Sequence, residues 1–257
     1  MTTLRIPDLS GKALLITGAS TGIGAALAQA FAAQGASVGV HYNASKDAAD
    51  AVVRAIAAAG GKAVLVRADA TKSYEIARAV EETAASFGRL DGLINNAGGM
   101  VGRMAYADMD DAYYDQVMDL NGRSVVAASR AAIPHLKRQG GFIINTSSIA
   151  ARNGAGNGAG LYGSSKALVS NITRGMAKEL IGFGIRVNAV APGVIDTPFH
   201  ERYSTEAQMK AMLATIPQGR VGTAEDCVGA YLFLASEALS GYLIGQVIEV
   251  NGGQLMP

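Results

Sequence analysis

The sequence predicts an α/β protein with a Rossmann-type, doubly wound parallel sheet of about seven strands and helices on both faces. Short apolar runs of five or six residues alternate with longer segments of helical spacing along the whole chain. The runs are apolar throughout, which is typical of strands that are buried on both faces of a parallel sheet. A strand, a glycine-rich turn and a helix follow one another near the N-terminus, as they do at the start of doubly wound folds.

Each element is predicted from its periodicity and from the glycines that end it. The predicted strands cover residues 13–17, 37–42, 62–67, 90–95, 142–146, 185–190 and 246–250. The predicted helices cover residues 23–34, 48–59, 73–87, 113–135, 162–180 and 223–235. Because these units repeat without a linker, we expect residues 1–257 to form a single domain. Residues 153–160 are rich in glycine and predict a mobile loop.

Composition and charge argue against several classes of protein. The 22 basic and 21 acidic residues leave a net charge of +1 and form no basic stripe, so no nucleic acid or membrane partner is expected. No secretory signal or membrane span is recognisable, and the single cysteine, Cys227, suits a reducing compartment, so we expect a cytoplasmic protein. Cys227 is expected in the core. The three histidines are far apart in the sequence, so no metal site is expected.

A glycine-rich turn, TGASTGIG at residues 17–24, directly follows the first predicted strand. Its glycines let the backbone approach a pyrophosphate, and the free N–H groups of the next helix stabilise an anion. A tight turn without a ligand is the alternative, whereas a P-loop is excluded because no Gly-Lys-Ser/Thr follows. The residues expected to contact the pyrophosphate are Gly18, Ser20, Thr21, Gly22, Ile23 and Gly24.

If the glycine-rich turn binds the pyrophosphate of a dinucleotide, the residues at the end of the second strand decide between NAD and NADP. An acidic residue there accepts the ribose 2′-hydroxyl of NAD and repels a 2′-phosphate. Here Tyr42 and Asn43 are followed by Ser45 and Lys46, and no carboxylate occurs before Asp47. The donors Asn43, Ser45 and Lys46 favour NADP(H), with NAD(H) possible. Ordinary solvated loop residues are the alternative interpretation.

A candidate proton-transfer group lies in the second half of the chain. Tyr162 and Lys166 are four residues apart in a predicted helix and therefore share one face. A nearby ammonium lowers the pKa of a phenol, which can then exchange a proton with an alkoxide. Such pairs are often mere surface contacts, but the fifth strand ends at Ser147 and Ser148, on the sheet edge where ligands bind. A serine hydroxyl there can hydrogen-bond the reacting oxygen.

Together these motifs resemble the short-chain dehydrogenase/reductase family, and the chain is similar to 3-oxoacyl-acyl-carrier-protein reductase-like members. The resemblance extends over about residues 9–253. It rests on TGxxxGxG at residues 17–24, NNAG at 95–98, YxxxK at 162–166 and the PG loop at 192–197. Because the motifs occur in order along nearly the whole chain, they are far more specific together than singly.

The resemblance implies roles for individual residues. Tyr162 would be the general acid/base, Lys166 would lower its pKa and bind the nicotinamide ribose, and Ser148 would polarise the carbonyl. Asn121 would bend its helix and hold a water in the proton relay. The further cofactor contacts that it implies are Asp69, Ala70, Asn95, Ala97, Gly98, Tyr162, Lys166, Pro192, Gly193, Ile195 and Thr197.

Four features depart from the family pattern, one of which is Asn251-Gly252-Gly253 in place of the usual D-G-G near the C-terminus. Thirteen residues separate Ser148 from Tyr162 where the family usually has twelve, so Ser147 is an alternative for the working hydroxyl. Thr21 stands where many NADP-preferring members carry Arg or Lys. Phe183 stands where acyl-carrier-protein reductases often have Arg, which counts against an acidic acyl carrier as the substrate.

The expected function is an NADP-dependent oxidoreductase that transfers hydride between a nicotinamide and a small-molecule carbonyl or secondary alcohol. An NAD-dependent sugar or polyol dehydrogenase of the same family, or a non-catalytic dinucleotide-binding regulatory protein, is the alternative. Residues 195–218 predict a substrate lid, with Met209, Met212, Leu213 and Ile216 at helical spacing, although a helix packed on the body fits equally. The resemblance also implies a homotetramer.

Overall fold

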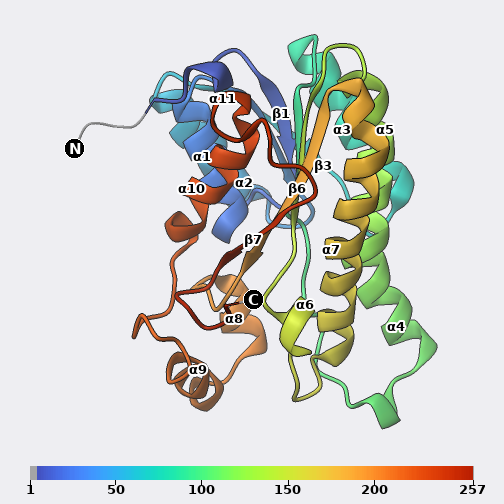
Figure 1. The fold of residues 1–257 in the computed structure, drawn as a ribbon, viewed down its shortest axis with the longest axis vertical. Helices are drawn as coiled ribbons and strands as arrows, with labels where there is room; N and C mark the ends of the chain where they lie inside the picture. Colours follow the sequence, from blue (N-terminus) through green and yellow to red (C-terminus); the bar gives the residue numbers. More distant parts are fainter. Residues whose placement is uncertain (1–4, 257) are drawn as a thin grey trace.

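A seven-stranded parallel sheet forms the centre of the protein in the computed structural model, which describes residues 5–256 (Figure 1). The strand order is β3-β2-β1-β4-β5-β6-β7, so the order reverses between β1 and β4. Such a switch point opens a crevice at the carboxyl ends of the strands. The strands are β1 (Ala13–Ile16), β2 (Ser37–Tyr42), β3 (Lys62–Arg67), β4 (Gly92–Asn95), β5 (Gly141–Thr146), β6 (Ile185–Pro192) and β7 (Val247–Val250). The predicted fold class is confirmed.

Helices cover both faces of the sheet (Figure 1). One face carries α1 (Gly22–Ala33), α2 (Lys46–Ala58) and α10 (Ala224–Ala235). The other carries α3 (Ser73–Phe87), α5 (Ser124–Leu136) and α7 (Gly160–Leu180). The shorter helices are α4 (Asp111–Met118), α6 (Ala150–Asn153), α8 (Pro198–Tyr203), α9 (Glu206–Leu213) and α11 (Glu237–Ser240).

Burial on both faces explains why the strand sequences are apolar throughout. In β1, Leu14 and Ile16 pack in the cluster beneath α1 and α10, whereas Leu15 packs in the cluster beneath α3 and α5. This is the alternation of side chains that a strand imposes. Phe31 of α1 stacks on Phe142 of β5 with ring centroids 6.4 Å apart. The sheet is therefore a rigid support for the loops at its carboxyl edge.

The predicted helix over residues 113–135 is interrupted in the structure. A π-helical turn, Asp119–Arg123, separates α4 from α5. The Asn121 side chain donates to the carbonyl oxygen of Val117 at 2.9 Å within this turn. Periodicity alone could not show the interruption, because apolar spacing continues on both sides of it.

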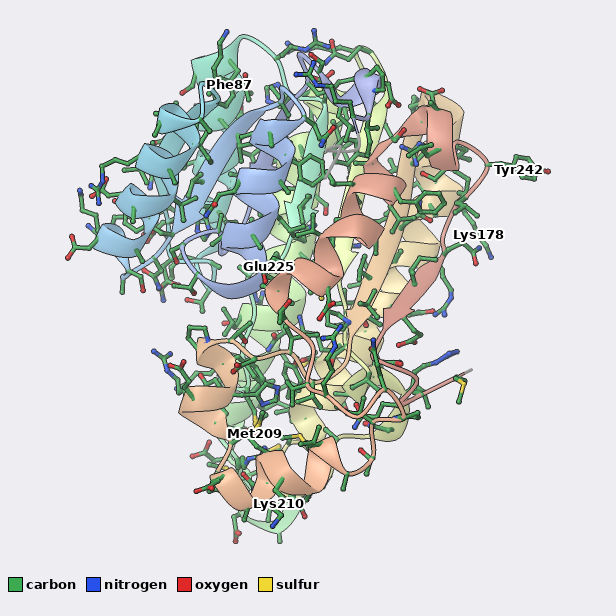
Figure 2. All side chains as sticks on the ribbon, turned by 90° about the vertical axis from the view of Figure 1, so that its left-hand side faces the viewer. Phe87, Lys178, Met209, Lys210, Glu225 and Tyr242 are labelled. Carbon is green, nitrogen blue, oxygen red and sulfur yellow. The ribbon has the colours of Figure 1, made fainter. Side chains whose placement is uncertain are left out.

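The predicted lid, residues 195–218, contains α8 and α9. Both helices lie beyond the carboxyl ends of the strands (Figure 1). In Figure 2, Met209 and Lys210 mark α9 at the end of the molecule farthest from Phe87. A capping box between Thr205 and Gln208 begins α9. This segment therefore lies where it can cover the crevice.

We predict that Gly92→Ala destabilises the sheet. A methyl group at Gly92 would lie 2.3 Å from the ring of Phe142 on the neighbouring strand, which cannot retreat because it packs against Phe31. Overpacking of this kind costs about 1–3 kcal/mol. Chemical denaturation should show a free energy of unfolding lower by that amount.

Gly175→Ala is the matched control. Gly175 lies on the exposed side of α7, and a methyl group there meets no atom within 4 Å. Alanine in a helix interior is more stable than glycine by about 0.5–1 kcal/mol. Equal effects of the two substitutions would show that Phe142 is not tightly packed against β4.

Candidate active site

A cavity of about 670 Å³ follows the carboxyl ends of the strands. Tyr42 and Asn43 line one end of it, and Tyr162, Phe199 and Met212 line the other. The volume is in the range of about 300–1,000 Å³ that is typical of ligand and cofactor pockets. The cavity lies at the switch point, where doubly wound folds bind their ligands.

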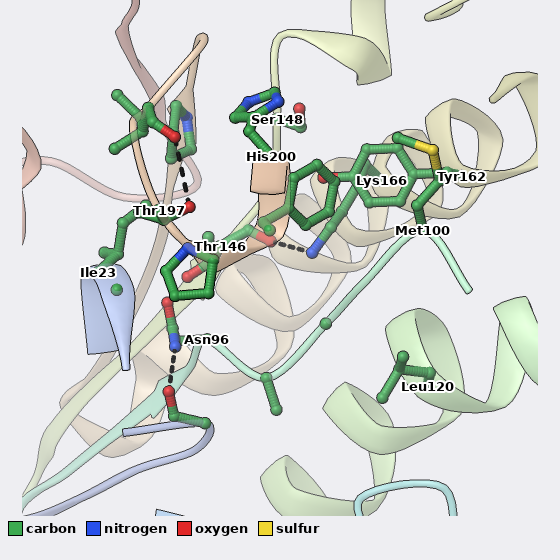
Figure 3. Close-up of a pocket in the computed structure, with 18 of the residues that line it drawn as sticks. Ile23, Asn96, Met100, Leu120, Thr146, Ser148, Tyr162, Lys166, Thr197 and His200 are labelled. Carbon is green, nitrogen blue, oxygen red and sulfur yellow. Dashed lines mark hydrogen bonds between the residues drawn. The ribbon is translucent and has the colours of Figure 1, made fainter. Parts of the chain in front are cut away.

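The glycine-rich turn forms the wall of the cavity beneath α1. Gly18 and Gly22 have positive φ angles of 64° and 54°, which disfavour other residues. Asn96 Nδ2 donates to the carbonyl oxygens of Thr17 at 2.9 Å and Gly18 at 3.0 Å, and these bonds fix the turn against β4 (Figure 3). No side chain caps the N-terminus of α1. Its free N–H groups therefore fit a pyrophosphate.

Most of the expected cofactor contacts line this cavity. Those that do are Gly18, Ser20, Thr21, Gly22, Ile23, Tyr42, Asn43, Ser45, Asp69, Ala70, Ala97, Gly98, Tyr162, Lys166, Pro192, Gly193, Ile195 and Thr197.

Two of the expected contacts, Gly24 and Asn95, are not among the residues that line the cavity. Gly24 is inside α1, where a methyl group would lie 2.2 Å from the carbonyl oxygen of Gly18. Asn95 is buried, and its Nδ2 donates to Asn145 Oδ1 at 2.8 Å and to Ser129 Oγ at 3.1 Å. Gly24 and Asn95 thus support the wall of the cavity, and their direct contact with a dinucleotide stays a prediction.

His41 is a support that the sequence did not reveal. The backbone N–H of Gly18 donates to His41 Nδ1 at 2.9 Å, so the proton of the ring is on Nε2, which donates to the carbonyl oxygen of Ala68 at 3.0 Å. Burial lowers the pKa of His41 to about 4. The neutral ring therefore joins the glycine-rich turn to the end of β3. A lone histidine in a strand carries no signal for such a role.

The polar end of the cavity brings together residues of β5 and α7. Lys166 Nζ donates to the carbonyl oxygen of Thr146 at 2.9 Å and lies 5.9 Å from the ring centroid of Tyr162 (Figure 3). The Ser148 side chain is hydrogen-bonded to the Tyr162 hydroxyl. Ser147 Oγ is instead bonded to Ser170 Oγ at 2.6 Å. Ser148, rather than Ser147, therefore faces the phenol.

The electrostatics of this end differ from the expectation. Burial raises the pKa of Tyr162 to about 12, although the bond with Ser148 acts in the opposite direction. Burial lowers the pKa of Lys166 to about 8. Desolvation therefore outweighs the predicted lowering of the Tyr162 pKa by Lys166, whose ammonium contacts Thr146. The phenol consequently keeps its proton at neutral pH.

Asn121 does not line the cavity, and its expected role of holding a water in the proton relay stays a prediction. Its Nδ2 donates to the carbonyl oxygens of Gly99 and Val117, each at 2.9 Å, and its Oδ1 accepts from the N–H of Gly99 at 3.0 Å. Backbone groups thus occupy the side chain. Asn121 fixes the segment that follows β4, beside Lys166, and does not itself contact Tyr162.

Aromatic residues of α8 form a wall that the sequence did not predict. The ring of Phe199 lies 5.7 Å from that of Tyr162 and 5.2 Å from those of His200 and Tyr203. Of the four apolar residues expected to form the lid, only Met212 lines the cavity. The helical spacing in α9 drew the prediction there, because α8 is too short to show a period.

Other chemistry finds little support in the described part of the chain. Residues 5–256 contain no group of three His, Cys, Asp or Glu side chains placed to hold a metal ion. Cys227 is buried in α10, and burial raises the pKa of its thiol to about 12. None of the helices within these bounds has the length and apolarity to span a membrane.

A crevice at a sheet switch point that ends in a protonated phenol defines a class of protein, the oxidoreductases that use a nicotinamide dinucleotide. Comparison with known proteins gives the family. The profile of the family described as Enoyl-(Acyl carrier protein) reductase matches residues 18–254. The chain belongs to the short-chain dehydrogenase/reductase family, as its motifs predicted.

Relatives and solved structures cover nearly the whole chain. The 3-oxoacyl-[acyl-carrier-protein] reductase of Synechocystis sp. is 39% identical over 253 residues, which are 96% of this chain and 98% of the relative. The NADH-dependent reductase A1-R′ responsible for alginate metabolism has a TM-score of 0.90 and 43% identity over 98% of this chain and 100% of its own. A short chain dehydrogenase from Burkholderia cenocepacia in complex with NADP has a TM-score of 0.89 and 36% identity, covering 96% and 98% of the two chains.

We predict that Gly24→Ala weakens dinucleotide binding. The added methyl group would push the carbonyl oxygen of Gly18 out of the turn, because the separation would be only 2.2 Å. An overpacking cost of about 1–3 kcal/mol corresponds to affinity lower by about ten- to a hundredfold. Titration calorimetry with NADP and NAD measures this loss. Gly229→Ala, in α10 with no atom within 4 Å, is the control that should bind normally.

Proposed function

We propose that the protein is a carbonyl reductase that uses NADP(H) in preference to NAD(H), with Tyr162 as the proton donor to the carbonyl oxygen. One observation carries the proposal: the half-buried phenol of Tyr162 lies inside the cavity with Ser148 beside it, and desolvation keeps the proton on the phenol. When bound, the reduced dinucleotide supplies the hydride. The protonated phenol is the form that can give a proton to the carbonyl oxygen during reduction.

Each polar side chain has a separate task in this reaction. Ser148 donates a hydrogen bond to the carbonyl oxygen, on which negative charge develops. Tyr162 then gives its phenolic proton to that oxygen, and the product is an alcohol. The Lys166 ammonium stabilises the phenolate that remains until solvent returns the proton. In the same proposal, residues 1–257 act as one domain and residues 195–218 close over the substrate.

We predict that Tyr162→Phe lowers turnover by about 10²–10⁴-fold, the usual contribution of a general acid. Affinity for the dinucleotide should stay within a few-fold of the wild type, because the ring remains in place. Steady-state reduction of a panel of ketones and aldehydes measures the first quantity, and calorimetry the second. Tyr114→Phe, at an exposed position of α4, is the matched control.

The rival function makes the opposite prediction. A non-catalytic regulatory protein would bind the dinucleotide and reduce nothing in the panel, with or without the Tyr162 hydroxyl. Turnover of the Tyr162→Phe variant equal to that of the wild type would contradict the proposed acid directly.

The preference for NADP(H) is proposed from the end of β2. Tyr42, Asn43 and Ser45 line the cavity there, and the loop that follows β2 has no carboxylate before Asp47 to repel a 2′-phosphate. Asp69 also lines this end, but it follows the neighbouring strand β3. Lys46, the expected cation, does not line the cavity and is bonded to Asp50 at 2.5 Å. Asp50 therefore competes with a phosphate for this ammonium, so the extent of the preference should depend on it.

We predict that Asp50→Asn raises the ratio of kcat/KM with NADPH to that with NADH, because it frees Lys46 for the phosphate. Lys46→Met should lower the same ratio. A contact between an ammonium and a phosphate supports a change of about tenfold. Arg54→Met, which removes an exposed positive charge from the same helix, is the control for the loss of a charge as such. A wild type that prefers NADH, or a ratio unmoved by either substitution, would contradict the assignment.

A 3-oxoacyl thioester on an acidic carrier is the second candidate substrate. The Synechocystis relative carries that name. Phe183 counted against it, but Lys137 Nζ lies 3.8 Å from the Phe183 ring centroid, so a cation is present at this surface after all. Reduction of acetoacetyl thioesters, with and without the carrier, separates this activity from that of a reductase of free carbonyls.

A further inference from the structure

The substrate end of the cavity carries an excess of positive charge. Arg103 and Arg202 line it near Tyr162, together with the uncharged imidazole of His200. The only carboxylate that lines the cavity in the described part of the chain, Asp69, follows β3 at the opposite, adenine end. A cavity end that is lined by cations and by no carboxylate attracts negatively charged ligands.

Neither arginine is neutralised by the protein. Within residues 5–256, no carboxylate oxygen lies within 4.0 Å of Arg103 or Arg202 in an ion pair. Arg103 is anchored by carbonyl groups alone: Nε donates to Tyr203 at 3.0 Å and Nη1 to Asn157 at 3.1 Å. These two bonds orient the guanidinium and leave its charge and its Nη2 donors for another partner.

The anchors place Arg103 between the two segments that close this end of the cavity. Tyr203 ends α8, and Asn157 belongs to the glycine-rich loop before α7. Val101, two residues earlier, has a φ of 65°, a strained conformation for a β-branched residue. The chain therefore accepts backbone strain in the turn that leads to Arg103.

Ring contacts show that this end is close to the reacting oxygen. Phe199 packs between Tyr162 and His200, with centroids 5.7 and 5.2 Å from its own. Burial and, to a smaller extent, the charge of Arg103 lower the pKa of His200, and they outweigh the charge of Asp196, which raises it. A neutral imidazole therefore lies beside the guanidinium. Figure 3 shows His200 at the same end of the pocket as Ser148 and Tyr162.

We propose that Arg103 and Arg202 bind an anionic group of the substrate, so that the preferred substrates are carbonyl compounds that carry a carboxylate or phosphate a few atoms from the carbonyl carbon. The proposal rests on the proposed function and specifies its substrate class. Arg103 supplies oriented donors to the anion, as a guanidinium does for carboxylates and phosphates generally. Arg202 adds a second charge at the rim.

The test compares matched substrates that differ only in charge. We measure kcat/KM for 4-oxopentanoate and for its methyl ester, with the preferred cofactor. The wild type should favour the acid by about tenfold or more, as expected for a charge-assisted contact. Arg103→Met and Arg202→Met should each reduce that preference and leave the ester within about twofold, because the ester makes no use of the cation. The same comparison of 3-oxobutanoate and 5-oxohexanoate with their methyl esters shows which separation between the carboxylate and the carbonyl carbon is preferred.

Two controls separate recognition from other effects. Lys210→Met removes an exposed cation of α9 that does not line the cavity, so it should leave the preference unchanged. Arg103→Lys is the second variant, for use if loss of the two carbonyl bonds destabilises Arg103→Met. It keeps the positive charge and should retain part of the preference for the acid. Dihydroxyacetone phosphate, compared with dihydroxyacetone, distinguishes a phosphate from a carboxylate as the anion.

Calorimetry makes the outcome independent of turnover. 4-Oxopentanoate should bind to the NADP-loaded protein more tightly than 4-oxopentanamide, and the double variant Arg103→Met, Arg202→Met should remove the difference. The anion site is overturned if the wild type shows equal kcat/KM for the acid and its ester and equal affinity for the acid and its amide. It is also overturned if the double variant still prefers the acid. Failure to reduce any carbonyl compound, charged or neutral, with anion binding intact, would instead count against the proposed function.

Discussion

The catalytic end of the cavity depends on one buried cation. Lys166 is only 3% exposed, and its ammonium donates to the carbonyl oxygen of Thr146 at 2.9 Å. Within the described residues no carboxylate pairs with the ammonium, so the carbonyl dipole of Thr146 alone offsets the cost of burying its charge. Burial therefore lowers the pKa of the Lys166 amine to about 8. The bond fixes α7 against the end of β5. Tyr162, one helical turn earlier, is thereby held opposite Ser148.

The surrounding residues fit this cation closely. A methyl group at Gly98 would lie 2.9 Å from Lys166 Nζ and 2.8 Å from Asn121 Oδ1, so only glycine fits there. Below the site, Asn145 accepts from Asn95 at 2.8 Å and donates to Thr173 of α7 at 2.9 Å. The helix is thus joined to β5 at two levels, and buried polar networks of this kind restrict the packing to one arrangement. Rigidity at this point keeps the proton donor in a fixed position relative to the glycine-rich turn.

Local patterns made most of the fold predictable, because strand runs and helix periods directly report burial. The Tyr162–Lys166 spacing and the placement of Ser148 after β5 followed from helix and sheet geometry. Arg103 and Phe199 could not be predicted, since their place in the cavity depends on contacts between segments far apart in the sequence. The pKa of Tyr162 was misjudged for the same reason: desolvation depends on packing around the whole site. The pairing of Lys46 with Asp50 could have been predicted from the sequence, because residues four apart in a helix lie side by side on its surface.

Direct observation of the Lys166 ammonium is the sharpest test of this arrangement. NMR of lysine side chains labelled with ¹³C at Cε, followed as a function of pH in the cofactor-free protein, reports each ammonium separately, and Lys166→Met assigns the signal. A buried ammonium on Thr146 predicts one lysine that loses its proton near pH 8 instead of near the ordinary value of 10.5. Titration of Lys166 near 10.5 would show a solvated ammonium and contradict the arrangement that holds Tyr162 in place.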